Sequence, residues 1–224
     1  MKPTIGILGG TGHEGKGLAL RWAHAGYPVV IGSRDPERAH ATAAEIASRV
    51  VGSSVVGTTN VAAAERATIC VLTVPYVAHR ATLEAVRGAL AGKILVDVTV
   101  PLLPPKVSRV QLPPEDSAAV AAQAILGPDV KVVSAFQNVS AHFLETVEGF
   151  VDCDVLVCGD DKDARESVVA LARAAGMRGV HGGVLANSTA AEALTSVLIF
   201  LNGRYKIKSS GIRFTGIPDD STAT

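Results

Sequence analysis

Residues able to bind phosphate occur within the first fifteen positions of this 224-residue chain. The apolar run at residues 4–8 leads directly into a glycine-rich turn, and a helical pattern follows from Gly15 onward. Gly10, Gly12 and Gly15 have the spacing G-x-G-x-x-G, which allows a tight turn, close approach of a pyrophosphate to the backbone and close packing of a helix on a strand. The free N–H groups at the helix start attract phosphate. We therefore predict a dinucleotide site, with a glycine turn that binds no ligand as the alternative.

A second group of candidate ligands follows the next strand, at the position that distinguishes NADP from NAD. Domains that bind NAD usually carry Asp or Glu there, to accept hydrogen bonds from the ribose. Here Ser33 and Arg34 occupy this position, and Asp35 before Pro36 has the pattern of a helix N-cap, which places Arg38 in the first helical turn. Two guanidinium groups and a hydroxyl suit a dianionic 2′-phosphate. The sequence therefore predicts NADP(H), with solvated surface arginines as the alternative.

The other strand ends carry few groups that could act as an acid or a base. They offer the apolar or hydroxyl-bearing residues Thr73, Val74, Pro75, Val98, Thr99 and Val100. His79 lies one turn into a predicted helix, and His142 has the pattern of an exposed helical histidine. Hydride transfer between two planar rings needs mainly proximity in a water-poor slot, so a shortage of acid–base residues is consistent with it. We predict no catalytic acid or base and no metal site.

Short runs rich in Val and Ile alternate with longer Ala-rich stretches of helical character. Strands are predicted at residues 4–8, 29–31, 54–57, 68–72, 94–97, 131–134 and 155–158, and helices at residues 15–25, 36–50, 77–90, 117–126, 163–175 and 186–201. This alternation predicts an α/β fold with a doubly wound, mainly parallel Rossmann sheet covered on both faces. Prolines predict a loop at residues 101–115, at a strand end where such sheets bind ligands. We predict a Rossmann domain over residues 1–182 and a small C-terminal helical cap over residues 183–224, with a polar tail at 218–224.

The composition argues against several classes of partner. Charge is balanced, with 21 Lys and Arg against 21 Asp and Glu, so we expect neither nucleic acid nor an anionic membrane surface to bind. No apolar run approaches the ~20 residues of a membrane span. Cys70, Cys153 and Cys158 lack metal-ligand spacing, and Cys70 lies in an apolar run, which indicates reduced thiols and a cytoplasmic location. We expect small-molecule cofactors as partners, and a homodimer or a higher homo-oligomer.

Taken together, these segments resemble the NADPH-dependent reductases of the deazaflavin coenzyme F420, the F420:NADP oxidoreductases. The shared stretches cover almost the whole chain and are Leu8-Gly9-Gly10-Thr11-Gly12, Gly15-Lys16-Gly17-Leu18-Ala19, Gly32-Ser33-Arg34, Val71-Leu72-Thr73-Val74-Pro75, Val132-Val133-Ser134-Ala135, Cys158-Gly159-Asp160-Asp161, Leu185-Ala186-Asn187-Ser188, Glu192-Ala193-Leu194-Thr195 and Gly211-Ile212-Arg213-Phe214. Other NADP reductases share the first motif. Its combination with the Cys-Gly-Asp-Asp and Asn-Ser segments is specific to this family.

The resemblance implies direct hydride transfer between NADP(H) and coenzyme F420, without a metal or a covalent intermediate. The implied contacts are Thr11, Gly12, His13 and Glu14 for the phosphates; Ser33, Arg34 and Arg38 for the 2′-phosphate; residues 73–75 and 98–101 for the nicotinamide; and Ala135, Gln137 and Val139 for the deazaflavin, under the cap. Archaeal members carry a histidine and a proline in the segment matching residues 137–140. Gln137 keeps hydrogen bonding there but does not titrate near neutral pH, which argues against a proton relay but not against hydride transfer.

Two other functions stay open from the residues alone. Imine reductases and the flavin-binding cytosolic domain of ferric reductases share this nucleotide domain, although an imine reductase usually adds a long helical dimerisation domain, for which the chain after Gly183 leaves little room. A non-enzymatic module that senses NADP(H) is the second alternative. A sensor needs one nucleotide only, whereas the proline-rich mouth at residues 98–105 and the cap suit a second planar ligand. This difference favours the enzyme.

Overall fold

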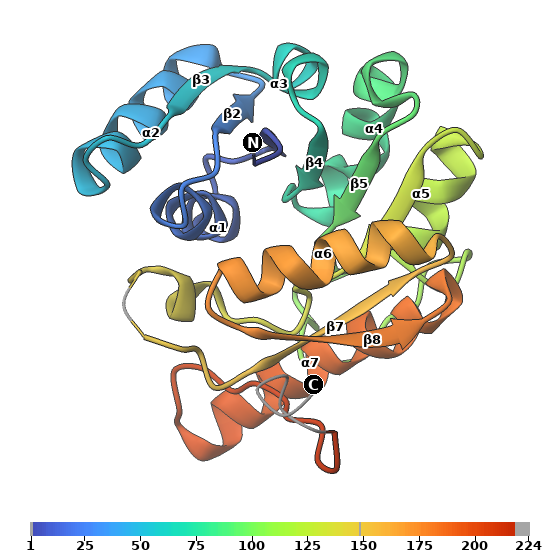
Figure 1. The fold of residues 1–224 in the computed structure, drawn as a ribbon. Helices are drawn as coiled ribbons and strands as arrows, with labels where there is room; N and C mark the ends of the chain where they lie inside the picture. Colours follow the sequence, from blue (N-terminus) through green and yellow to red (C-terminus); the bar gives the residue numbers. More distant parts are fainter. Residues whose placement is uncertain (1, 148, 218–224) are drawn as a thin grey trace.

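The computed structural model describes residues 2–147 and 149–217, and within them eight strands form one sheet (Figure 1). The strands are β1 (Ile5–Leu8), β2 (Val29–Ser33), β3 (Val55–Thr59), β4 (Ile69–Leu72), β5 (Ile94–Asp97), β6 (Lys131–Ser134), β7 (Asp154–Gly159) and β8 (Arg178–Gly183). Their order across the sheet is β3-β2-β1-β4-β5-β6-β7-β8. Strands β1 to β6 run parallel, β7 pairs antiparallel with β6, and β8 pairs parallel with β7. The predicted doubly wound, mainly parallel sheet is therefore confirmed.

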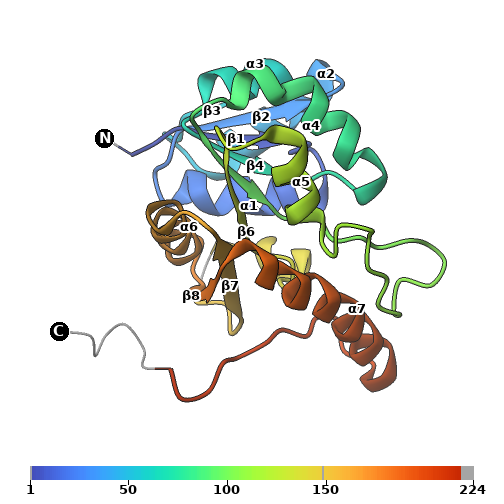
Figure 2. The same ribbon diagram turned by 90° about the vertical axis from the view of Figure 1, so that its right-hand side faces the viewer.

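Helices cover both faces of this sheet (Figure 2). They are α1 (His13–His24), α2 (Pro36–Arg49), α3 (Asn60–Arg66), α4 (Tyr76–Leu90), α5 (Ala118–Leu126), α6 (Lys162–Ala174) and α7 (Ser188–Tyr205), with the short 3-10 helices η1 (Ala141–Leu144) and η2 (Leu185–Asn187). Buried side chains of α1, α2 and α6 form one hydrophobic cluster with the sheet, and those of α3, α4 and α5 form a second. Helix α7 packs beside α5 and β7. The sheet is thus the middle layer between two cores.

The change of direction between β6 and β7 follows from their connection. Parallel neighbours need a crossover, and helices such as α4 and α5 supply one between β4, β5 and β6. The described part of the connection from β6 to β7 holds only the one-turn helix η1, so the chain returns antiparallel. The parallel part of the sheet that begins with β1 is therefore complete at β6, and β7 and β8 extend it.

Two elements were not predicted from the sequence. Strand β8 contains Arg178, His181 and three glycines, and it lacks the apolar run by which the other strands were recognised. Helix α3 has seven residues, too few for a periodic pattern. The predicted strands all form, with ends that move by one or two residues. Helix α7 begins two residues later than predicted, because η2 precedes it, and extends to Tyr205.

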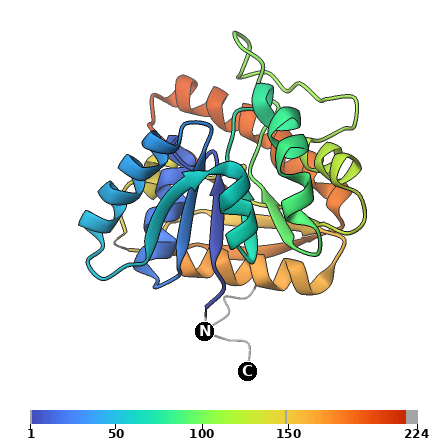
Figure 3. The same ribbon diagram turned by 90° about the horizontal axis from the view of Figure 1, so that it is seen from above.

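The proline-rich connection between β5 and α5 forms neither helix nor strand, as predicted, and Figure 3 shows it projecting beyond the sheet. The predicted polar tail at residues 218–224 lies outside the described residues. The predicted division between residues 182 and 183 falls at the end of β8, and it stays a prediction. No helix within the described residues is long and apolar enough to cross a membrane.

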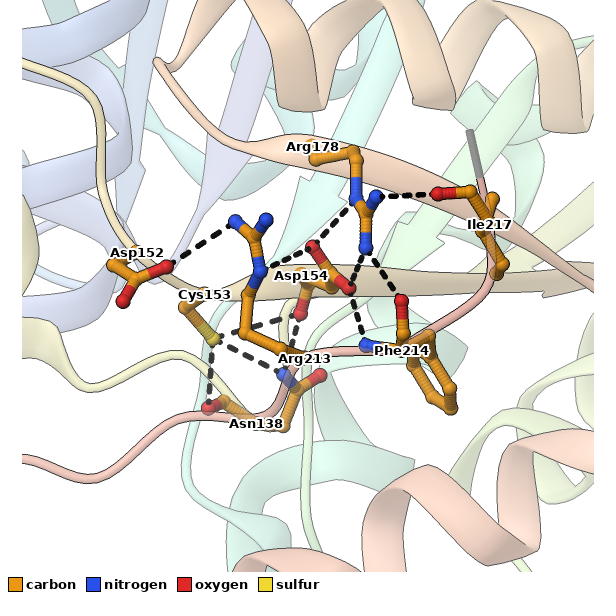
Figure 4. Close-up of polar contacts among 8 residues, drawn as sticks. All are labelled: Asn138, Asp152, Cys153, Asp154, Arg178, Arg213, Phe214 and Ile217. Atoms are coloured by element: carbon orange, nitrogen blue, oxygen red, sulfur yellow. Dashed lines mark hydrogen bonds and ion pairs between the residues drawn. The ribbon is translucent and has the colours of Figure 1, made fainter. Parts of the chain in front are cut away.

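A buried ion pair holds the C-terminal segment against the edge of the sheet (Figure 4). Arg178 donates from Nε and Nη2 to the two carboxylate oxygens of Asp154, at 2.8 and 2.6 Å. The backbone N–H of Phe214 also donates to Asp154 Oδ2, at 2.6 Å, and Asn138 Nδ2 donates to the Asp154 carbonyl oxygen, at 2.7 Å. Asp154 therefore joins β8, the C-terminal segment and the chain after β6 in one place.

Candidate functional site

The glycine-rich turn between β1 and α1 packs tightly against the end of β4. Gly9 has φ +77°, and a Cβ built on it would lie 2.4 Å from Val74 Cγ1. A Cβ on Gly15 would lie 2.5 Å from Thr73 Oγ1. Both positions are therefore closed to a side chain, and a Cβ on Gly10 would also lie close to Ile7 O, at 3.0 Å. The contact at Gly15 supports its predicted role in helix–strand packing, whereas Gly9, which the motif did not include, is the glycine with positive φ in the turn.

Gly12 differs from these glycines because the protein leaves space around it. It is the N-cap residue of α1, and the nearest atom to a Cβ built there is Gly9 O, at 3.9 Å. No side chain caps this helix among the described residues, so the first N–H groups of α1 are available to a ligand. Packing does not require glycine at this position, whereas close approach of a phosphate to the backbone does.

A cleft of about 860 Å³ opens beside this turn, at the carboxyl ends of the parallel strands. The predicted residues that line it are Thr11, Gly12, His13, Glu14, Ser33, Arg34, Arg38, Thr73, Val74, Pro75, Val98, Thr99 and Val100. Asn60, Tyr76, Ala78 and Thr82 also line it and were not predicted, whereas Leu102 of the lining lies within the predicted mouth at residues 98–105. The strand order changes direction between β1 and β4, and ligands of such sheets bind at this switch point.

The cationic end of the cleft lies after β2. Asp35 Oδ1 accepts hydrogen bonds from the backbone N–H groups of Glu37 and Arg38, at 3.1 and 3.4 Å, so its predicted capping role is confirmed. Arg34 and Arg38 are exposed, and neither forms an ion pair within the described residues. Because the nearby carboxylate caps the helix, the two guanidinium groups remain available to a dianion.

Glu14 brings an unsatisfied carboxyl group to the cleft. The residue lies in the first turn of α1, and its Oε1 atom is shielded from solvent and has no hydrogen-bond partner among the described residues. Burial raises the pKa of Glu14 to about 8. At neutral pH the group therefore carries a proton, and it can both donate and accept a hydrogen bond.

Beneath the cleft lies a buried pair that sequence reasoning missed. His79 Nε2 of α4 lies 2.7 Å from Asp97 Oδ2 at the end of β5, and Asp97 Oδ1 accepts from the Thr99 backbone N–H at 2.9 Å. The Tyr76 ring stacks on the His79 ring, with the centroids 6.1 Å apart. His79 does not line the cleft, so this pair fixes the wall and does not reach a ligand directly. The available signal was an aspartate that ends the apolar strand at Ile94–Asp97.

The three residues predicted to contact a deazaflavin lie deeper than the cleft wall. Ala135, Gln137 and Val139 are buried, and the cleft lining does not include them. Gln137 Nε2 donates to the Asp97 carbonyl oxygen at 2.7 Å and to Ser134 Oγ at 2.8 Å. Their contact with a deazaflavin stays a prediction.

The remaining polar candidates have structural partners. His142 is exposed and pairs with Glu145, at 3.3 Å from Nδ1, which agrees with the surface interpretation. Asp161 caps α6 by accepting from the Ala164 backbone N–H at 2.8 Å. The three cysteines are buried free thiols, and no group of His, Cys, Asp and Glu within the described residues could hold a metal ion.

Comparison with known proteins agrees with this geometry. Residues 4–101, which contain most of the cleft, match the family model described as NADP oxidoreductase, coenzyme F420-dependent. The F420-dependent NADP reductase of Methanothermobacter marburgensis is 42% identical over 96% of this chain and 99% of its own length.

Two further likenesses concern a solved structure and a larger protein. The crystal structure of a candidate F420-dependent NADP reductase from Arthrobacter sp. FB24 superposes with a TM-score of 0.82 at 27% identity, over 95% of this chain and 99% of that one. The metalloreductase STEAP3 of Rattus norvegicus is 31% identical over 86% of this chain, which corresponds to 36% of its own length. Because the likeness to the archaeal reductase spans both chains almost completely, this chain belongs to the family of coenzyme F420-dependent NADP oxidoreductases.

Proposed function

We propose that this chain transfers a hydride directly between NADP(H) and coenzyme F420. The observation that carries the proposal is the cleft at the switch point, which a helix start without a side-chain cap and two arginines without an ion pair, among the described residues, line at the ends of β1 and β2. These features fit the two anionic groups of NADP(H), the pyrophosphate and the 2′-phosphate. Full-length similarity to an F420-dependent NADP reductase supports the second substrate.

The residues fit NADP(H) in two places. The open space beside Gly12 allows phosphate oxygens to reach the first N–H groups of α1, and Thr11 and His13 line the same turn. Ser33, Arg34 and Arg38 would hold the 2′-phosphate, and the carboxylate at this strand end, Asp35, is engaged at Oδ1 as the cap of α2.

When both are bound, NADPH supplies a hydride with its electron pair to the deazaflavin ring, and a solvent proton completes the reduced product. The chain contributes alignment and exclusion of water. Thr73, Val74 and Pro75 after β4 and Val98 and Thr99 after β5 form a wall with few ionisable groups. The backbone behind this wall is fixed, because Thr73 Oγ1 donates to the Leu8 carbonyl oxygen at 3.1 Å. Rings held in such a slot need no acid or base from the protein.

The deazaflavin would lie on the nicotinamide side of the cleft, toward the chain after β6. We propose Ala135, Gln137 and Val139 as the backing of that side. Gln137 connects it to α7, because Thr195 Oγ1 donates to the Gln137 carbonyl oxygen at 2.8 Å.

Two measurements test the function. Purified protein is mixed with NADPH and oxidised F420, and loss of the visible absorbance of the deazaflavin is followed. NADPH deuterated at the transferable position of C4 is then used, and the deazaflavin product is analysed by mass spectrometry. We expect turnover without added metal or flavin, and deuterium in the product. Absence of deuterium from the product would rule out direct transfer.

The metalloreductase relative makes a second acceptor worth measuring. Its likeness to this chain covers 36% of its length, so most of that protein lies outside the match. A ferric chelate with added flavin, and an imine, serve as alternative acceptors in the same assay. Turnover of either one, together with inactivity toward F420, would favour a reductase of another acceptor.

We also propose that the chain works as a homodimer or higher homo-oligomer in the cytoplasm. Helix α7 leaves the apolar residues Val197 and Phe200 exposed, which is consistent with a contact between copies. The three buried cysteines are free thiols, as in a reducing compartment. Light scattering of the purified protein tests the first statement, and cell fractionation tests the second.

A further inference from the structure

One buried polar group of the cleft, the carboxyl group of Glu14, has no role in the proposed function so far. Glu14 lines the cleft, yet Oε1 has neither solvent nor a hydrogen-bond partner within the described residues. A buried acceptor without a partner costs free energy, so one that lines a cleft is a candidate contact for a ligand.

The phosphates do not account for this group. The N–H groups at the start of α1 can bind them without a side-chain donor. The 2′-phosphate residues lie after β2, on the other side of β1 from β4. The side chain of Glu14 is therefore free to bond a part of the ligand that is not anionic.

The packing of α1 shows which side of the cleft Glu14 faces. The neighbouring Gly15 abuts the end of β4, where a built Cβ would lie 2.5 Å from Thr73 Oγ1. Residues three, four and seven positions apart share one face of a helix. Seven positions after Glu14, Arg21 Nη2 donates to the Phe143 carbonyl oxygen at 2.8 Å. Glu14 is thus on the face of α1 that looks toward β4 and the chain after β6.

A dinucleotide in a doubly wound sheet extends across the switch point, from β2 to the strands beyond β1. With the adenosine end at Arg34 and Arg38, the nicotinamide end lies over β4 and β5. We propose that the carboxyl group of Glu14 hydrogen-bonds the carboxamide of the nicotinamide and so fixes the rotation of that ring. This inference rests on the proposed function.

The chemistry of the two groups is complementary. The carboxamide has an NH₂ donor and a carbonyl acceptor, and a protonated carboxyl group has one O–H donor and one free acceptor. Burial favours the protonated form, since it raises the pKa of Glu14 to about 8. The pair can therefore form two hydrogen bonds in a site that excludes water, without a buried charge.

A cycle of variants and nucleotide analogues tests the contact. The variants are Glu14→Leu, which removes both polar atoms, and Glu14→Gln, which keeps an acceptor and a donor. Glu65→Leu is the matched control, because Glu65 is an exposed glutamate of α3 that does not line the cleft. The ligands are NADP⁺, its 3-acetylpyridine analogue, which lacks the NH₂ donor, and 2′-phospho-ADP-ribose, which lacks the nicotinamide. Dissociation constants are measured by calorimetry, and kcat and KM with F420 are measured in parallel.

We expect Glu14→Leu to weaken NADP⁺ binding by roughly 3- to 10-fold, as for loss of a hydrogen bond, and to leave 2′-phospho-ADP-ribose binding unchanged. The wild-type chain and Glu65→Leu should prefer NADP⁺ to the acetylpyridine analogue, Glu14→Gln should keep that preference, and Glu14→Leu should lose it. A merely structural role would weaken all three ligands together. Because ring rotation governs alignment, kcat of Glu14→Leu should also fall.

Two results would overturn the inference, and they are distinguishable. If the wild-type chain turns over F420 with NADPH but Glu14→Leu still prefers NADP⁺ to the analogue, the contact is wrong and the proposed function stands. If the wild-type chain binds neither NADP⁺ nor 2′-phospho-ADP-ribose, both are wrong.

Discussion

The preference for NADPH over NADH should depend on the two exposed arginines after β2. We predict that Arg34→Ala and Arg38→Ala each lower kcat/KM for NADPH and leave kcat/KM for NADH almost unchanged. A hydrogen bond between charged groups contributes about 1.5–3 kcal/mol, which is roughly 10- to 150-fold in a rate or binding ratio. Solvent screens exposed charges, so the lower end, about tenfold per arginine, is the expected size.

Each arginine side chain can be removed without breaking an ion pair of the described structure. Asp35, which follows Arg34, accepts at Oδ1 from the N–H groups of Glu37 and Arg38, so this oxygen holds the helix cap. The side chains have no ion pair within the described part of the chain, so their removal should not unfold the protein. Melting temperatures close to that of the wild type would confirm this point.

The assay compares kcat/KM for both nucleotides with F420 as the second substrate, at low and at moderate ionic strength. Arg66→Ala serves as the control, since Arg66 is exposed at the end of α3 and does not line the cleft. The NADPH advantage should shrink as salt rises, because the contact is electrostatic. An unchanged NADPH/NADH ratio in both arginine variants would refute the assignment of the 2′-phosphate site.

Three further predictions concern binding and stability. Gly12→Val should fold normally, because no atom lies within 3.9 Å of the added Cβ, but calorimetric titration should detect no NADPH binding; near-normal affinity would contradict the phosphate site. Burial raises the pKa of Asp154, but the hydrogen bonds from Arg178 and other donors outweigh it and hold the pKa below its ordinary value of 3.8. The folded protein should therefore lose stability as the pH falls through that acid range. Asp154→Asn should cost about 3–5 kcal/mol at pH 7 in urea unfolding and remove this acid loss, and a wild-type-like acid curve would argue against the ion pair. Burial, reinforced by the charge of Asp97, raises the pKa of Glu192 to about 8 from 4.5, so the free energy of unfolding should decrease as pH rises between those values; Glu192→Gln should flatten that slope, and an unaltered slope would assign it to another group.

The sequence predicted those parts of the fold that local patterns determine. Strands β1 to β7 were recognisable because they are short apolar runs, and α2 because Asp35 and Pro36 mark its start. Strand β8 was not recognisable, because its first residue, Arg178, is charged. Its pairing with Asp154 makes that charge compatible with burial. That pairing joins residues 24 positions apart, and no local pattern encodes it.

In the candidate site, too, the parts that lie within short motifs were predicted and the long-range contacts were not. The turn at Gly12 and the arginines after β2 lie within motifs of a few residues, so their positions in the cleft followed from the sequence. The contact between His79 and Asp97 did not, because it needs the register of β4 against β5, in which Leu72 faces Asp97. The burial of Gln137 depends on the same strand end, through its bond to the Asp97 carbonyl oxygen.

These contacts also explain how polar side chains beneath the cleft are compatible with a reaction that needs no acid or base from the protein. Asp97 is buried and does not line the cleft, and His79 and the Thr99 N–H each bond one of its carboxylate oxygens. Thr73 Oγ1 is likewise committed to the Leu8 carbonyl oxygen. Such groups stiffen the wall against which the rings lie, and stiffness is what alignment requires. Among the described residues of the cleft lining, Glu14 is the one whose buried side-chain oxygen lacks a partner, so a nicotinamide that bonds it displaces no existing bond.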